Sequence, residues 1–272
     1  MTATQENRPV IDIRNLSCYY GDKLALDNIN LTVNEREILV IMGHSGSGKS
    51  TLLRNVLGLL TPSSGQVEVL GKEISRLKKK ELYELRKNIG VAFQNGALFS
   101  SLSVRENIEL PLREHTDLDD NTIHIMTMMK LMQMNLADHG DMMPAELSGG
   151  MLKRAGLARA VIMDPKLLFF DEPSAGLDPV TSAELDQLIL QLRDALNMSI
   201  IIITHEMESA FNVADRITVL DQGKQILTGS REEIKASSDQ RIINMLGRIA
   251  RDEDVDAEAY LHKLTHKNLP RK

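Results

Sequence analysis

A glycine-rich segment, residues 43–51, carries the residue types best suited to bind phosphate. It fills every position of the pattern G-x-x-x-x-G-K-[ST], and it lies between an apolar run, 38–42, and a helical pattern, 50–60. Backbone N–H groups of such a loop and the N-terminus of the following helix can surround an anion. The predicted nucleotide-binding residues are Gly43, His44, Ser45, Gly46, Ser47, Gly48, Lys49, Ser50 and Thr51. We expect Lys49 to reach the outer phosphates and the Ser50 hydroxyl to ligate Mg²⁺. The alternative is a glycine-rich turn without a ligand, but a Lys-Ser pair in this strand–helix context favours a nucleoside triphosphate site.

A second candidate site is the end of the apolar run 167–170, where two carboxylates, Asp171 and Glu172, follow directly. Asp171 could complete a Mg²⁺ shell opposite Ser50, and Glu172 could orient or deprotonate an attacking water. By itself the pattern is equally typical of a strand that meets solvent. Together with the phosphate-binding loop it favours phosphoryl chemistry.

Three single residues are weaker candidates. Gln94 follows the apolar run 89–93, where its amide could meet metal and water, and His205 follows the run 200–203, where it could touch a γ-phosphate. Tyr20 precedes a glycine and could stack on a base. Each also has an ordinary interpretation: a surface glutamine, a structural histidine and a packed tyrosine.

The segment Leu147-Ser-Gly-Gly-Met151 predicts the start of a helix that runs through Ile162. Ser148 is a suitable N-cap, and Gly149 and Gly150 leave the first turn without side chains, which makes a second anion-binding helix end. An ordinary capped helix fits the local pattern equally well.

The remaining sequence indicates an α/β fold. Segments 10–16 and 26–33 alternate apolar and polar residues, which predicts antiparallel strands, whereas 38–42, 167–171 and 199–204 predict buried parallel strands. Segment 216–227 predicts a closing hairpin. The expected domains are an N-terminal tail 1–9, a nucleotide-binding domain 10–235 with a helical insertion at about 97–160, and a helical extension with a charged tail, 236–272.

Composition limits the possible partners. The chain has 272 residues and a formal net charge of −6, which argues against a nucleic-acid partner. Its single cysteine, Cys18, is typical of a reducing compartment. No apolar run is long enough to cross a bilayer, and no signal peptide is evident. We therefore expect any association with a membrane to depend on other subunits.

Taken together, the motifs resemble the ATPase subunits of ATP-binding cassette (ABC) transporters over residues 10 to 230. The match includes Tyr20-Gly, the phosphate-binding loop, Gln94, Leu-Ser-Gly-Gly, Asp-Glu, Ser174-Ala-Gly-Leu-Asp178 and His205. The resemblance implies a P-loop NTPase fold with a RecA-like parallel sheet core, an antiparallel β subdomain and a helical subdomain. It also implies ATP and Mg²⁺ as cofactors and a head-to-tail dimer, in which Ser148, Gly149 and Gly150 contact the ATP of the second copy.

Residue roles also follow from this resemblance. Tyr20 would stack on adenine, Glu172, Gln94 and His205 would act in catalysis, and Asp178 would communicate across the dimer. The metal ligands would be Ser50, Gln94 and Asp171. One position departs from the family, because Met151 stands where glutamine is usual after Leu-Ser-Gly-Gly. The phosphate-facing groups are kept.

A finer resemblance lies in residues 93–102 and 106–116, together with Leu-Ser-Gly-Gly-Met and Asp-Glu-Pro-Ser-Ala-Gly-Leu-Asp-Pro179. These segments are similar to the ATPases of the Mla phospholipid-trafficking, or MCE-type, systems of Gram-negative bacteria. The resemblance implies three partners besides a second copy: a transmembrane permease, an MCE-domain lipid-binding protein and a small cytosolic STAS-domain protein. The location would be the cytoplasmic side of the bacterial inner membrane, with peripheral attachment through these partners.

Several alternatives remain open at this point. The cargo could be another small solute, or the chain could be a soluble, non-transport ABC ATPase, although it holds one cassette and lacks sustained heptads. The methionine-rich run 126–134 is expected mainly to fill the core of the helical insertion, with a partner surface as the alternative. The tail 252–272 could be disordered or could be an arm that grips a neighbouring subunit.

Overall fold

The computed structural model describes residues 9–247, which fall into two units divided after Ala236. The expected N-terminal tail, except for Pro9, lies outside the described residues. The expected charged tail, 252–272, also lies outside them. The first unit contains all the motifs discussed above. The described part of the second unit consists mainly of helix α9 (Gln240–Leu246). No helix in the described part is long and apolar enough to cross a membrane.

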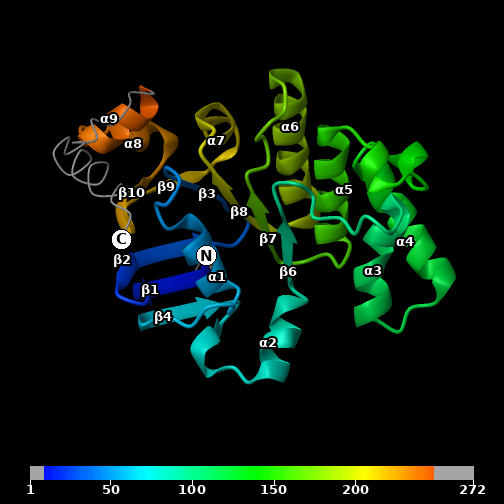
Figure 1. Ribbon diagram of the computed structural model, residues 1–272, viewed down its shortest axis with the longest axis horizontal. Coiled ribbons are helices and arrows are strands. Elements are labelled where there is room, and N and C mark those ends of the chain that lie inside the picture. Colours follow the sequence, from blue (N-terminus) through cyan, green and yellow to red (C-terminus); the bar gives the residue numbers. More distant parts are fainter. Residues whose placement is uncertain (1–8, 248–272) are drawn as a thin grey trace, which may run out of the picture. The chain divides into compact units, whose positions relative to one another are not determined.

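An antiparallel sheet opens the first unit, with strand order β2–β1–β4–β5. Its strands are β1 (Pro9–Tyr20), β2 (Lys23–Asn34), β4 (Ser64–Val69) and β5 (Lys72–Glu73). Figure 1 shows these strands in blue and cyan, below the larger sheet. The long β1–β2 hairpin confirms the alternating pattern, since one face is buried and the other is exposed.

The second sheet has the order β10–β9–β3–β8–β7–β6, in which all neighbours are parallel except β9 and β10. Its strands are β3 (Ile38–Met42), β6 (Ile89–Ala92), β7 (Leu167–Asp171), β8 (Ser199–Thr204), β9 (Arg216–Asp221) and β10 (Lys224–Gly229). Every residue of β3 and β8 is buried. The three continuously apolar runs therefore form central strands, as expected for a sheet covered on both faces.

Alternate side chains of the parallel strands serve two cores. Leu39 and Ile41 of β3 join Ile201 and Ile203 of β8 in one apolar cluster with the antiparallel sheet and helix α1 (Lys49–Val56). The opposite face of the sheet contacts helix α7 (Met207–Val213) at β3 and β8. Short helices α2 (Lys79–Arg86) and α8 (Arg231–Lys235) and the long helix α6 (Pro179–Leu196) complete the unit around the sheets.

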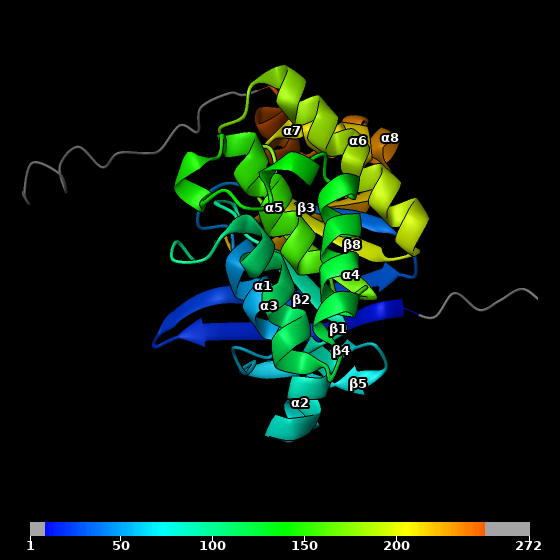
Figure 2. The same ribbon diagram turned by 90° about the vertical axis from the view of Figure 1, so that its right-hand side faces the viewer.

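The helical insertion consists of α3 (Val104–His115), α4 (Asp120–Gln133) and α5 (Gly149–Val161). Figure 2 shows these helices facing the viewer, in front of the sheets.

Single 3₁₀ turns lie at Ile74–Arg76, Ala137–His139 and Pro144–Glu146. The helix predicted after Leu147 begins as expected, because the Ser148 hydroxyl accepts a hydrogen bond from the Met151 N–H at 3.3 Å. The expected fold class, with its parallel core, antiparallel β subdomain and helical subdomain, is confirmed.

The prediction that most of the methionines in 126–134 fill the core holds only in part, since Met126 and Met128 are half-buried. Met134 is fully buried, but Met129 and Met132 are each 64% exposed on α4. With Ile125, also exposed, they follow the spacing i, i+4, i+7 and form one apolar stripe on the outer side of the helix. The buried side of α4 is made instead by Ile123, Thr127, Lys130 and Leu131. For this stripe, the interpretation as a partner surface therefore fits better than the interpretation as part of the core.

Two backbones of the insertion pack closely, at Gly156 in α5 and Gly96 before α3. A Cβ on Gly156 would lie 2.7 Å from the Gly96 Cα and 2.8 Å from its carbonyl oxygen. Such distances require the backbone itself to move. Only glycine lets α5 approach the segment that carries Gln94 so closely.

Gly156→Ala should therefore lower the free energy of unfolding by about 1–3 kcal/mol, because overpacking outweighs the gain of about 1 kcal/mol in helix propensity. Gly149→Ala is the matched control in the same helix, since its Cβ would meet nothing closer than the Leu177 Cδ2 at 3.9 Å. Urea-induced unfolding followed by circular dichroism measures both. Equal or greater stability of Gly156→Ala than of Gly149→Ala would contradict the packing argument.

Candidate nucleotide site

The glycine-rich loop connects β3 to α1, and two of its glycines are required by close contacts. A Cβ on Gly43 would lie 2.3 Å from the Leu220 carbonyl oxygen, and one on Gly48 would lie 2.7 Å from the Leu26 Cδ2. Gly48 is also the N-cap of α1, in a left-handed conformation with φ of 107°. No acidic residue stands in the first turn of α1. The loop therefore presents backbone and a positive helix end, a combination that favours an anion.

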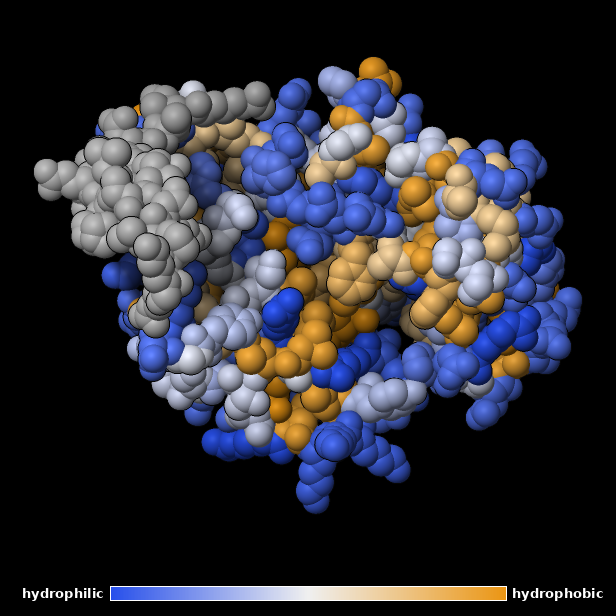
Figure 3. Space-filling view, in the orientation of Figure 1, coloured by the Kyte–Doolittle hydropathy of each residue, from blue (hydrophilic) through white to orange (hydrophobic). Residues whose placement is uncertain are grey.

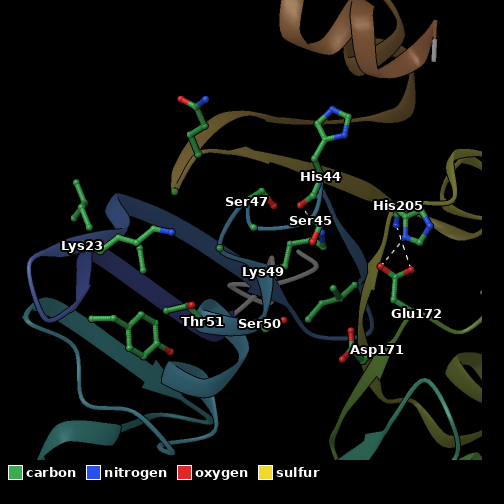
Figure 4. A pocket seen from close by; sticks show the side chains of 18 of the residues that line it. Lys23, His44, Ser45, Ser47, Lys49, Ser50, Thr51, Asp171, Glu172 and His205 are labelled. Carbon is green, nitrogen blue, oxygen red and sulfur yellow. Dashed lines mark hydrogen bonds and ion pairs between the residues drawn. The ribbon is translucent and has the colours of Figure 1, made fainter. Parts of the chain in front are cut away.

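Lys49 lies across the mouth of this loop. Its ammonium donates to the Gly43 carbonyl at 2.6 Å and to the His44 carbonyl at 3.0 Å. Burial lowers the pKa of Lys49, and the nearby carboxylates of Glu172 and Asp171 oppose that shift. In Figure 4 its side chain lies between the loop and the two carboxylates. A partly desolvated cation at this place is well suited to attract phosphate.

The two carboxylates of the second motif have different environments. Glu172 receives hydrogen bonds at Oε2 from the Thr204 hydroxyl at 3.1 Å and the His205 N–H at 3.3 Å. Its Oε1 lies 2.9 Å from the His205 Nδ1 (Figure 4). Burial, followed by repulsion from Glu172, raises the pKa of Asp171. Glu172 is thus held as a hydrogen-bond acceptor. The charged form of Asp171 is disfavoured by burial and by the negative charge of Glu172.

Strand register explains why these groups meet. Met42 pairs with Thr204, and Asp171 pairs with Ile203, so all three motifs leave the sheet at the same edge. The Glu172 N–H then donates to the Ile203 carbonyl at 2.7 Å, and Glu172 takes a left-handed φ of 51°. The chain thus turns sharply after β7 and directs the carboxylate towards His205.

One cavity of about 820 Å³ brings most of the predicted residues together. Its lining includes Tyr20, His44, Ser45, Gly46, Ser47, Gly48, Lys49, Ser50, Thr51, Gln94, Asp171, Glu172 and His205. Gly43 contributes through its carbonyl, which accepts a hydrogen bond from Lys49. The volume and the polar lining suit a ligand of nucleotide size.

Besides Gly43, four predicted residues do not line this cavity. Ser148 caps α5 and is exposed with Gly149, while Gly150 is half-buried. Asp178 caps α6, where its carboxylate accepts from the Val180 N–H at 3.0 Å and the Thr181 N–H at 3.1 Å. Hydrogen bonds from Thr181 lower the pKa of Asp178. Within a single chain these residues are therefore separate from the phosphate-binding loop.

The sequence interpretation missed part of the lining. Lys23, Leu24 and Ala25 reach the cavity from the β1–β2 hairpin, and Gln222 and Gly223 reach it from the β9–β10 turn. The Gly223 N–H donates to the Ser47 carbonyl at 3.0 Å. The only local signal was the turn sequence itself, because the contact joins segments far apart in the chain.

Comparison with known proteins identifies the family. A family model described as "ABC transporter" matches residues 26–175. The chain belongs to the ABC transporter ATPase family. The ATP-binding protein MlaF of the intermembrane phospholipid transport system of Haemophilus influenzae is 42% identical over 88% of this chain and 91% of its own. MlaF of Escherichia coli K12 is 39% identical over 89% of this chain and 90% of its own.

Solved structures agree. The protein cbiO1 from Clostridium perfringens, part of the ABC transporter complex cbiONQ, aligns with a TM-score of 0.79 and 30% identity over 95% of this chain and all of its own. The cassette MJ0796, solved as a dimer bound to ADP and Pi, aligns with a TM-score of 0.74 and 29% identity over 81% of this chain and 98% of its own. The chain is accordingly a nucleotide-binding ABC ATPase, and the cavity is where its phosphate-binding loop lies.

Asp171→Asn should raise the free energy of unfolding at pH 7 without added nucleotide, by up to about 1 kcal/mol. A carboxyl whose pKa is raised on folding stabilises the folded state below its unfolded pKa and loses that contribution as pH rises through its folded pKa. The gain from asparagine should therefore be present at neutral pH and disappear in acid. Urea unfolding at several pH values measures it.

Glu172→Gln is the adjacent control, and it should give no such gain, because the wild-type carboxylate already makes three hydrogen-bonding contacts with Thr204 and His205. A pH-independent gain for Asp171→Asn, or a loss of stability, would show that burial of the charge is not the cause.

Proposed function

We propose that this cassette is the ATP-hydrolysing subunit of a transporter that moves phospholipid between the inner and outer membranes of a Gram-negative bacterium. The observation that carries the proposal is the similarity to MlaF over about nine-tenths of both chains, including the segments around Gln94 and Ser148. Under this proposal the chain lies at the cytoplasmic side of the inner membrane, and attachment comes through partner subunits.

The cavity supports specific roles for its residues. Lys49 and the loop N–H groups would hold the phosphates, and Tyr20, exposed at the cavity wall, would stack on adenine. Glu172 would accept the proton of the attacking water, since Thr204 and His205 keep its carboxylate oriented. His205, with an exposed ring, would also contact the γ-phosphate.

Mg²⁺ fits the donor chemistry of the site. The Ser50 hydroxyl, the Asp171 carboxylate and the Gln94 amide line the same cavity and offer oxygen ligands. Residues 9–247 contain no group of three or more His, Cys, Asp and Glu side chains able to hold a metal by themselves. Mg²⁺ would therefore bind together with phosphate oxygens, and its contribution when bound is to neutralise charge that develops during hydrolysis.

A second copy would complete the site. Ser148 and Gly149 are exposed at the N-terminus of α5, which has no acidic residue in its first turn. A head-to-tail dimer would bring this positive helix end to the nucleotide of the other copy. The dimeric form of MJ0796 supports such an arrangement. Asp178, at the start of α6, would lie in the connection between the two sites.

A permease would occupy an apolar groove between the sheet core and the helical insertion. The groove has a volume of about 490 Å³, and its lining includes Leu59, Tyr83, Phe93, Pro111, His115 and Arg159. Figure 3 shows apolar side chains gathered over the middle of this face, next to a hollow beside the helical insertion. Phe99 is 54% exposed and lies under the Arg159 guanidinium, 5.9 Å from its ring centre. An exposed apolar groove of this kind favours a protein partner.

The remaining partners rest on the resemblance to the Mla systems: an MCE-domain lipid-binding protein and a small STAS-domain protein. The exposed stripe of Ile125, Met129 and Met132 on α4 is a surface that a small cytosolic partner could cover. It lies on a different element from those that line the permease groove.

Another cargo is the alternative with direct support. A protein named probable ribonucleotide transport ATP-binding protein mkl, from Mycobacterium tuberculosis, is 37% identical over 90% of this chain and 70% of its own. The residues of the nucleotide cavity do not distinguish cargoes, because cargo is handled by the membrane subunits. Identification of the bound lipid or solute in the purified complex decides between the two.

Glu172→Gln in the intact complex should keep ATP affinity within about twofold but reduce hydrolysis by at least about 100-fold, because an amide cannot accept the proton. Lys49→Ala should instead weaken ATP binding by about tenfold or more, because it removes a charge that meets phosphate in the ground state. Calorimetric titration and phosphate release measure the two effects. Normal ATP binding by Lys49→Ala, or wild-type turnover by Glu172→Gln, would remove that residue from its role.

Affinity purification from detergent-solubilised membranes tests the partner and the cargo together. The wild-type protein should bring down a multispanning membrane protein and phospholipid. Phe99→Asp should lose most of that permease, because a carboxylate would enter an apolar interface, while ATP affinity stays near normal. Met129→Asp, exposed on α4, should keep the permease and is the control. A permease retained by Phe99→Asp would exclude the surface formed by Phe99 and Arg159 as a permease contact. A soluble solute in place of lipid would overturn the proposed cargo.

A further inference from the structure

A buried lysine connects the start of α5 to the loop that carries the proposed base. Lys153 is 6% exposed, and its ammonium donates to the carbonyl oxygens of Pro173 and Ala175, both at 2.6 Å. A third hydrogen bond reaches the Glu172 carbonyl at 3.2 Å. Three carbonyls of one loop thus converge on a single side chain and use the three donors of the ammonium.

This arrangement is selective for a cation. Burial lowers the pKa of Lys153, with opposition from the charge of Glu172, so the protein bears a desolvation cost to keep an ammonium here. An apolar side chain of the same length could fill the space, but it would leave the three carbonyl oxygens without this donor. Lys153 therefore does more than fill space in the core, because its three hydrogen bonds fix the path of the loop.

The fixed loop positions Glu172. Its backbone has a left-handed φ of 51°, which a non-glycine residue adopts only when the surroundings enforce it. Thr204 and His205 hold the carboxylate from the end of β8, whereas Lys153 holds the carbonyl side from α5. The proposed base is thereby held between two elements, of which one is the helix that begins at Ser148.

We propose that Lys153 is a positioning residue that makes the location of Glu172 depend on the placement of the N-terminus of α5 in the same chain. Lys153 lies in the second turn of α5, after Ser148–Gly150. On the proposed function, that N-terminus contacts the nucleotide of the other copy. Nucleotide in one site of the dimer would then be sensed by the base of the other site through a single ammonium.

Lys153→Met and Lys153→Arg test the positioning role in the intact complex. Methionine removes every donor, so kcat should fall by about 10- to 100-fold, since small misplacement of a reacting group has effects of this size. KM should stay within about twofold, because Lys153 does not line the nucleotide cavity. Arginine keeps the donors and should recover most of the loss. The Hill coefficient for ATP should fall towards 1 in the methionine variant.

Lys130→Met is the matched control. Lys130 is 8% exposed in α4 of the same helical insertion, and its ammonium bonds the Asp164 carboxylate at 2.7 Å. Loss of this buried lysine should lower the melting temperature without changing kcat or the Hill coefficient. If both variants lose kcat in proportion to their loss of stability, Lys153 is merely structural and the inference is overturned.

Mixed dimers with two affinity tags separate the possible routes. Glu172→Gln in one copy leaves a single active base, and Lys153→Met is then placed either in the copy with that base or in the other. Only the first placement should reduce the remaining turnover, and it should reach the level of a dimer in which both copies carry Lys153→Met beside the single Glu172→Gln. A loss of turnover from the second placement alone would assign Lys153 to the helix contact instead.

Failure of the proposed function has a different signature. If Glu172→Gln leaves turnover intact, the base assignment falls, and the positioning role falls with it. If Glu172→Gln abolishes turnover and Lys153→Met leaves kcat unchanged, only the inference about Lys153 is overturned.

Discussion

The register of the buried parallel strands is the constraint on which the site depends. β3 pairs with β8 and β9, and β7 pairs with β8, so Gly43, Asp171 and Thr204 are forced to the same edge of the sheet. A slip of one residue would move each motif by about 3.3 Å and turn its side chain to the opposite face. Because every residue of β3 and β8 is buried, such a slip would also place apolar side chains in the wrong core.

Helix α5 contacts several of the segments that this register positions. Near the start of α5, Lys153 donates to carbonyl groups of the loop that begins at Glu172. One turn later, Gly156 packs directly on Gly96. Arg159 donates to the Gly96 carbonyl at 3.1 Å. The same helix therefore contacts both the segment of Glu172 and the segment of Gln94. Arg159 also lines the apolar groove and lies over Phe99. Helix α5 therefore connects the nucleotide cavity, its own exposed N-terminus and the proposed permease surface.

Much of the fold and the cavity could be predicted because the signals are local. The continuous apolar runs gave the limits of β3, β7 and β8, and the phosphate-binding loop and Ser148 cap lie where their patterns indicated. These features depend on residues a few positions apart. A buried strand or a capped helix can therefore be read without knowledge of its neighbours.

What the sequence could not predict depends on distant contacts. The exposed stripe of α4 was misjudged, because methionine occurs both in cores and on adaptable surfaces and its composition does not indicate a face. Gln222 lines the nucleotide cavity only because of pairing between distant segments. Lys153 gave no signal, because a lysine on a helix is usually solvated and its three carbonyl partners lie some twenty residues later in the chain.

The pairing of Glu172 with His205 adds a requirement to the proposed mechanism. A carboxylate that acts as a base needs a free lone pair directed at water, yet Oε2 already accepts two hydrogen bonds and Oε1 faces the His205 Nδ1 at 2.9 Å. The bonds at Oε2 come from the end of a fully buried strand, so they are fixed. The His205 ring is exposed and can rotate. A carboxylate oxygen has two lone-pair directions, so Oε1 keeps one for water while His205 occupies the other. A γ-phosphate beside the loop that turned the His205 ring towards itself would loosen this contact and leave the fixed bonds at Oε2 to orient the base. The orientation of Glu172 would in this way respond to the nucleotide itself.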